Sequence, residues 1–181
     1  MSNPQLALLK KQLFVTWTFA EQALADLTED ECLWTPSRDS WTVRPDGGGR
    51  WRPDWVEPEP PALPPTSLGW ILWHAIWWWS MVIDHSFGNA TLRREEVDWP
   101  GAAGSMPALR TLHDGWLVLL DGLTDTDLDD NTRTRWPYTD GRSFGLVAGW
   151  VNIELMKNIA EMSLTRRSTP FYAEGRFNGD R

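Results

Sequence analysis

The chain has 181 residues and a formal net charge of −8 at pH 7. A chain of this length folds as one domain and buries a sizeable core without disulfides. The acidic balance disfavours a nucleic-acid partner, because binding nucleic acid depends on Lys and Arg neutralising phosphates. Fourteen tryptophans are far above ordinary usage, so we expect a core organised around indole rings.

Cysteine usage and hydropathy indicate a cytoplasmic protein. Cys32 is the sole cysteine, which excludes an intramolecular disulfide. The N-terminus lacks the basic and apolar regions of a signal peptide. The longest apolar run is interrupted by His74, Ser80, Asp84 and His85, so it falls short of the roughly 18 apolar residues of a membrane span. We therefore expect no membrane partner.

Four segments have the apolar periodicity of amphipathic helices. We predict helices over residues 4–27, 67–87, 105–123 and 143–167. The first helix has one apolar stripe made of Leu6, Leu9, Leu13, Trp17, Ala20, Leu24 and Leu27. In the third helix, Pro107 is tolerated in the first turn. Arginines in the last turn of the fourth helix suit the helix dipole.

The segment 28–66 between the first two helices is expected to be an ordered loop. Its prolines and the three consecutive glycines at 47–49 are incompatible with a regular helix. It also contains four indoles, which favour packing across one end of the helical core over mobility: Trp34, Trp41, Trp51 and Trp55. The sequence has no convincing strand pattern. We therefore predict an all-α protein, a four-helix bundle over residues 1–167 with long crossover loops, followed by a tail at 168–181.

Polar residues interrupt the apolar stripes of two helices. His74 and His85 share a stripe of the second helix with Leu68, Ile71, Trp78 and Met81. Glu154 and Asn158 share a stripe of the fourth helix with Val147, Val151 and Met162. Residues three or four apart lie on one helix face. We expect His74, Glu154 and Asn158 to converge in the bundle interior.

The sequence resembles the DinB-like superfamily of bacterial four-helix bundles. The resemblance lies in Ser-Leu-Gly-Trp-Ile-Leu-Trp-His at 67–74, Trp-Pro-Gly at 99–101 and Glu-Leu-Met-Lys-Asn-Ile-Ala-Glu at 154–161. It implies a divalent metal, zinc or nickel, held by a second-helix histidine and a Glu-x-x-x-His or His-x-x-x-His pair on the fourth helix. His74 and Glu154 match this pattern, whereas Asn158 replaces the final histidine.

The resemblance also implies chemistry with a low-molecular-weight thiol such as mycothiol, bacillithiol or glutathione. A metal at His74 and Glu154 would lower the pKa of such a thiol for attack on a small electrophile. An amide oxygen at Asn158 is a weak ligand for zinc. His85 lies about 16 Å further along the helix at 1.5 Å per residue, too far to replace it at the same ion.

Several functions remain open from the sequence, and no catalytic residue is identified. The first is a metal-dependent thiol S-transferase. The second is a non-catalytic small-molecule-binding or stress-associated bundle that has lost the metal, with Trp78 and His85 as candidate ligand contacts. A hydrogen-bonded pair of His74 and Glu154 kept only for packing is the simplest alternative.

The triplet Trp77-Trp78-Trp79 wraps more than half of the helix circumference. One core cannot cover all three indoles. Either the proline-rich loop packs over them, or they form part of a dimer surface, where aromatic residues are enriched. We expect a homodimer.

Overall fold

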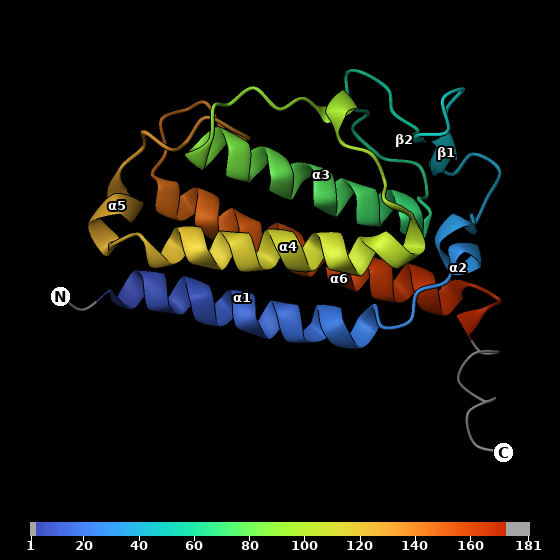
Figure 1. The fold of residues 1–181 in the computed structure, drawn as a ribbon, viewed down its shortest axis with the longest axis horizontal. Helices are drawn as coiled ribbons and strands as arrows, with labels where there is room; N and C mark the ends of the chain where they lie inside the picture. Colours follow the sequence, from blue (N-terminus) through green and yellow to red (C-terminus); the bar gives the residue numbers. More distant parts are fainter. Residues whose placement is uncertain (1–2, 173–181) are drawn as a thin grey trace, which may run out of the picture.

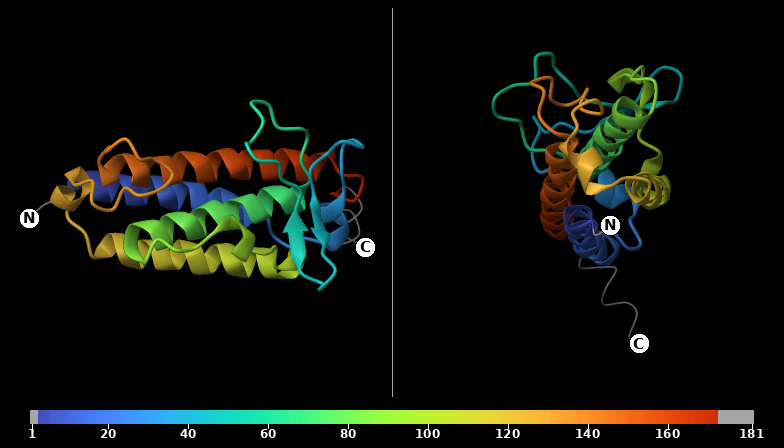
Figure 2. Two further views of the ribbon diagram at one scale, coloured as in Figure 1. Left: turned by 90° about the horizontal axis from the view of Figure 1, so that it is seen from above. Right: turned by 90° about the vertical axis from the view of Figure 1, so that its left-hand side faces the viewer.

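The computed structural model describes residues 3–172, so part of the predicted tail, residues 173–181, lies outside the described residues. Within the described range the protein is mostly helical, in agreement with the all-α prediction. Long helices lie side by side in Figures 1 and 2, namely α1 (Pro4–Ala23), α3 (Leu68–Phe87), α4 (Gly101–Asp121) and α6 (Phe144–Ser168).

Shorter elements lie in the connections. They are α2 (Glu29–Leu33), β1 (Val43–Pro45), β2 (Trp51–Pro53), η1 (Arg94–Glu96) and α5 (Asp125–Asp129). Figure 1 shows that α1 and α6 run in one direction and that α3 and α4 run in the other. The segment between α3 and α4 therefore returns along the length of the molecule. Within residues 3–172, no helix combines the length and apolarity that crossing a bilayer demands.

The segment 28–66 contains regular structure that we predicted to be absent. Thr28 caps α2 in a reciprocal box with Glu31, a pattern that satisfies two free backbone N–H groups. β1 and β2 pair antiparallel, with Val43 opposite Pro53. The carboxylate of Asp46 closes the connecting turn by accepting the N–H of Gly48 over 2.8 Å. The prolines are tolerated because both strands are edges.

Two predicted helix boundaries were also wrong. α1 ends at Ala23, before a turn in which Asp26 has a positive φ of 53°, so the predicted last turn is absent. α4 begins at Gly101, four residues earlier than predicted, so Pro107 lies inside the helix. The added turn is stabilised by Ser105, whose hydroxyl donates to the carbonyl of Gly101 over 2.7 Å.

Tryptophans dominate the core, as expected. Five of them are at most 2% exposed, namely Trp73, Trp78, Trp79, Trp99 and Trp116. Buried indole N–H groups gain stability when they find an acceptor. Trp73 donates to the carbonyl of Val97 over 2.8 Å, and Trp99 donates to the hydroxyl of Ser105 over 3.0 Å. These bonds tie the loop segments to α3 and α4.

The triplet at the centre of α3 lies inside the molecule. Trp78 is 1% exposed and Trp79 is 0% exposed. Trp77 is covered by two loop indoles, since its ring centroid lies 5.4 Å from that of Trp55 and 5.8 Å from that of Trp136. Trp77 stays partly exposed, so the loop indoles cover most of this triplet and leave little of it for a dimer surface.

Candidate ligand pocket

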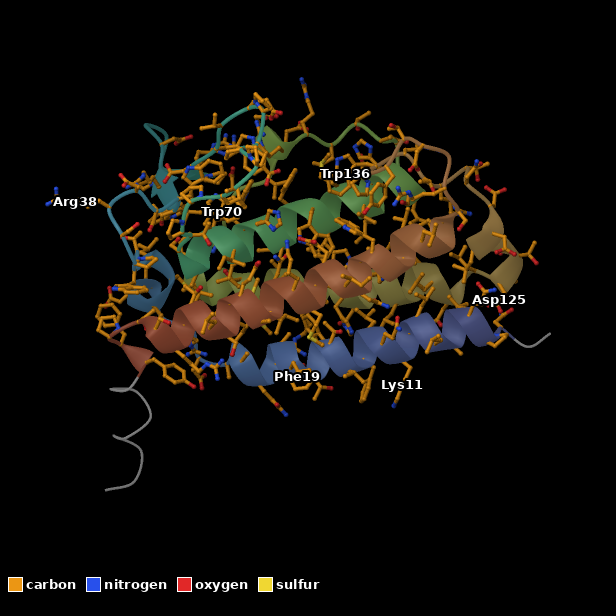
Figure 3. The ribbon with its side chains drawn as sticks, turned by 180° about the vertical axis from the view of Figure 1, so that it is seen from behind. Lys11, Phe19, Arg38, Trp70, Asp125 and Trp136 are labelled. Carbon is orange, nitrogen blue, oxygen red and sulfur yellow. The ribbon has the colours of Figure 1, made fainter. Side chains whose placement is uncertain are left out.

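A cavity of about 490 Å³ lies between the proline-rich segment, α3 and α6. Ligand sites of globular proteins have volumes of roughly 300–1,000 Å³. Figure 3 shows Trp70, one of the wall residues, on the side of α3 that the loop covers. The wall comprises Pro36, Glu59, Leu63, Pro64, Pro65, Thr66, Trp70, Ile71, His74, Lys157, Asn158, Glu161, Leu164 and Thr165.

His74 lies in the cavity wall with its imidazole stacked on Trp70, at 5.1 Å between ring centroids and an interplanar angle of 12°. Its Nδ1 atom is buried and has no hydrogen-bond partner among the described residues. The pKa of His74 is lowered to about 4, chiefly by burial and also by the positive charge of Lys157, while a hydrogen bond with the side chain of Asn158 opposes this shift. The imidazole is therefore neutral at pH 7 and offers a free polar nitrogen.

Asn158 is 1% exposed, and both ends of its amide are used. The oxygen accepts the indole N–H of Trp78 over 2.8 Å, and the nitrogen donates to a carboxylate oxygen of Glu161 over 3.0 Å. These bonds fix the amide in one orientation. Trp78 thus acts behind the wall, through Asn158, and does not line the cavity itself.

Glu154 is held by a different partner from the one expected. Its carboxylate pairs with the ammonium of Lys157 at 2.6 Å, and it is not among the described residues that line the cavity. The structure thus brings His74 and Asn158 to one cavity, together with Lys157 and Glu161. We did not single out the last two residues from the sequence.

His85 lies near the other end of α3. Its Nε2 is 3.4 Å from the carbonyl oxygen of Leu92, in the segment that returns to α4. It is not a wall residue of the cavity that contains His74. Its role as a ligand contact therefore stays a prediction that the position of this cavity does not favour.

The donor set at the cavity does not fit a tightly held zinc or nickel ion. Within residues 3–172, no three His, Cys, Asp or Glu side chains cluster as metal ligands. The amide of Asn158 is engaged at both ends, and a neutral amide is a weak zinc ligand. The charge of Lys157 already disfavours a proton on His74, and it would repel a dication more strongly.

Cys32 is not a candidate nucleophile. It is 0% exposed. Burial raises the pKa of its thiol to about 12, and the charges of Glu31 and Glu29 add to this effect. The thiolate is the reactive form of cysteine, so this residue is inert at neutral pH.

Comparison with known proteins identifies the family. The model of the DinB superfamily matches residues 12–162, a range that contains α3, the following crossover and the cavity residues Lys157, Asn158 and Glu161 of α6. The chain therefore belongs to the DinB superfamily. A search of the curated proteins and a search of the solved structures each found no match.

Proposed function

We propose that this member of the DinB superfamily is a four-helix bundle that binds a small zwitterionic molecule without a resident metal. The observation that carries the proposal is the cavity at His74, where a desolvated imidazole nitrogen without a partner lies in a wall of apolar and charged side chains. A buried polar atom without a partner costs stability in the free protein. A ligand N–H or O–H donated to the neutral imidazole would remove that cost.

The composition of the wall supports a ligand with an apolar body and both signs of charge. Trp70, Ile71 and the loop prolines supply apolar contact. Lys157 provides a positive group, and Glu161 and Glu59 provide negative groups. All three side chains are exposed to solvent, so they remain able to pair with charged groups of a ligand. An amino acid or a small peptide carries complementary groups for both.

The thiol transferase that the family resemblance implies is the competing function. It requires a metal to generate the thiolate, and the side chains at the cavity are poor ligands for zinc or nickel. A thiol peptide such as glutathione is nevertheless zwitterionic, so it belongs to the ligand class that the wall charges favour. We propose binding of such a molecule in the cytoplasm, where a single buried cysteine such as Cys32 stays reduced.

The test is a binding titration measured by isothermal titration calorimetry, with alanine, phenylalanine and glutathione as probes. We expect saturable binding of phenylalanine or glutathione that is at least tenfold weaker in His74→Ala. His85→Ala is the matched control, because it removes the other histidine of α3 and leaves the wall intact. Failure of all three probes to bind, or equal weakening by both substitutions, would contradict the proposal.

Elemental analysis of the purified protein separates the two functions. We expect less than stoichiometric zinc and nickel, even after incubation with either ion and removal of the excess. Stoichiometric metal that is lost in His74→Ala would support the transferase.

A further inference from the structure

α6 has a second apolar stripe on the side away from the cavity. Positions three and four apart repeat along its whole length in a heptad pattern, the spacing that lets one helix face pack against another. The first five of these positions are apolar or small and the last two are polar: Leu146, Gly149, Ile153, Met156, Ala160, Ser163 and Arg167. A helix that covers the core on one side normally has a polar opposite side. This stripe is therefore not explained by the core.

α1 has a matching second stripe beside it. Leu8, Val15 and Phe19 recur at steps of seven and four and are 60%, 42% and 52% exposed. On α6, Ile153 is 71% exposed. Figure 3 shows Phe19 and Lys11 on the outer edge of α1. Large apolar side chains thus gather on a surface shared by two neighbouring helices, which we call the α1/α6 face.

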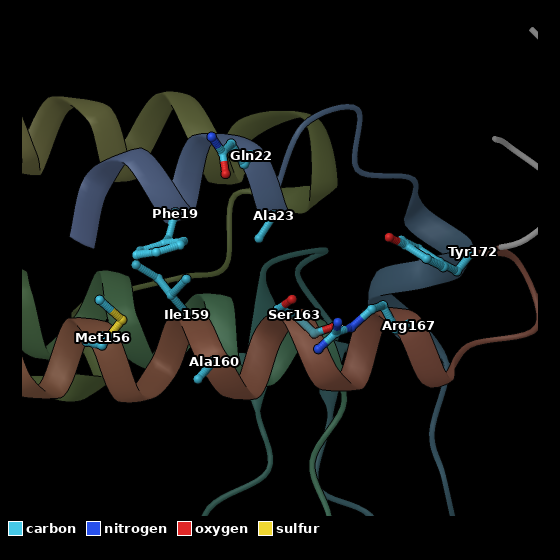
Figure 4. A pocket seen from close by; sticks show the side chains of 9 residues that line it. All are labelled: Phe19, Gln22, Ala23, Met156, Ile159, Ala160, Ser163, Arg167 and Tyr172. Carbon is cyan, nitrogen blue, oxygen red and sulfur yellow. The ribbon is translucent and has the colours of Figure 1, made fainter. Parts of the chain in front are cut away.

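Two grooves run along the α1/α6 face. One has a volume of about 600 Å³ and lies between Val15 on α1 and Gly149, Ile153 and Met156 on α6. The other, shown in Figure 4, has a volume of about 340 Å³ and lies between Phe19 on α1 and Met156 and Ala160 on α6. Small residues such as Gly149 and Ala160 leave room for side chains of a partner.

The described part of the chain does not cover this face. Figure 1 shows the long connections gathered over α3, whereas α1 lies at the opposite edge of the molecule. Contiguous exposed apolar surface of this kind marks an interaction site.

The charges on the face favour a second copy of this chain. The molecule has a net charge of −8, so two copies repel each other over most of their surfaces. The described residues that line the two grooves include no Asp or Glu, and their charged members are Lys11 and Arg167. Two copies would meet here with their acidic groups kept apart.

The size of the face also suits a dimer. Helices of 20 and 25 residues at 1.5 Å per residue and a diameter of about 10 Å present roughly 700 Å² in projection. A standard stable interface buries about 800 Å² per partner. Side chains that project from the two helices add to the projected area, so the area of the α1/α6 face is of the same order. We propose that the α1/α6 face is the surface through which two copies form a twofold-symmetric dimer.

Sedimentation velocity over a range of concentrations tests the proposal. We expect the full chain to sediment at about twice its monomer mass of 20.8 kDa. Ile153→Glu and Val15→Glu should each weaken the dimer at least tenfold, because each buries a carboxylate in the interface. Both side chains are exposed in the single copy, so the helices should still fold, which circular dichroism will verify.

Val118→Glu is the matched control, because Val118 on α4 is also 71% exposed and lies outside both grooves. It should leave the dimer unchanged. A monomer at the highest soluble concentration, or a dimer that Ile153→Glu and Val15→Glu leave as tight as Val118→Glu does, would overturn the proposal.

Discussion

The indole N–H of Trp78 on α3 donates to the side-chain oxygen of Asn158 on α6 over 2.8 Å. Each of these residues is 1% exposed, so water is not available to replace the bond. The same amide donates to Glu161 at the cavity. The bond thus connects the packing of the bundle core to the orientation of a wall residue.

Replacing Asn158 with Leu should lower the free energy of unfolding by about 1–3 kcal/mol, the cost of leaving a buried donor without an acceptor. Urea denaturation measures the change through the midpoint at constant slope.

The control is a double-mutant cycle with Trp78→Phe, which removes the N–H group. If the hydrogen bond carries the cost, Asn158→Leu should be less destabilising in the Trp78→Phe background. Equal costs in both backgrounds would show that the bond contributes nothing.

The sequence predicted the long helices well because their apolar stripes repeat over five or more turns. It predicted the inward position of His74 and the burial of Asn158 for the same reason, since both replace apolar residues on such stripes. Helix periodicity defines which face a residue occupies. These two residues consequently line one cavity, as α3 and α6 pack together.

The rest of the site depends on contacts that periodicity does not encode. Glu154 lies on the same predicted stripe as Asn158, yet its partner is Lys157, one turn away. The other wall of the cavity comes from the segment around Leu63 and Pro64, whose path over α3 is determined by tertiary packing. The small helix α2 had a readable signal in Thr28 and Glu31, which the neighbouring proline-rich composition obscured.

The unfolding free energy should depend on pH through His74. The pKa of this side chain is about 4 in the folded protein against 6.5 as the ordinary value, so the unfolded chain binds the extra proton between these pH values. Stability is therefore fully present above pH 6.5 and falls as the pH decreases toward 4, by roughly 3 kcal/mol at about 1.4 kcal/mol per pKa unit.

Denaturation at several pH values will measure this slope in the wild type and in His74→Gln, which cannot titrate in that range. We expect the slope between pH 4 and 6.5 to flatten in His74→Gln and to persist in His85→Gln. An unchanged slope in His74→Gln would show that this imidazole is not the group responsible.

A buried ion pair fastens the end of α6 to the turn after α1. The guanidinium of Arg166 donates to Glu31 over 2.8 Å and to the carbonyls of Ala23 and Ala25 over 2.9 and 2.7 Å. Burial raises the pKa of Glu31, but the bonds from Arg166 and Thr28 outweigh it and leave that pKa lowered. The carboxylate is therefore charged and needs its partner.

Replacing Arg166 with Met should destabilise the fold by about 3 kcal/mol, because it leaves a buried charge and several carbonyls without a donor. Arg38→Met is the control, since Arg38 is exposed and its change should stay within about 0.5 kcal/mol. Thermal or urea unfolding will compare the two. An Arg166→Met variant as stable as the control variant would contradict the assigned role of the ion pair.

Restoring the histidine that the family resemblance implies should create a metal site. We expect Asn158→His to bind zinc at least tenfold more tightly than the wild type, because an imidazole replaces an amide opposite His74. Competition with a chromophoric chelator measures the affinity. Asn152→His is the matched control, because Asn152 is the other buried asparagine of α6 and bonds to Leu9 on α1, away from the cavity. If both variants bind zinc equally weakly, the side chains at 74 and 158 do not meet around a common point, and the loss of metal binding extends beyond a single substitution.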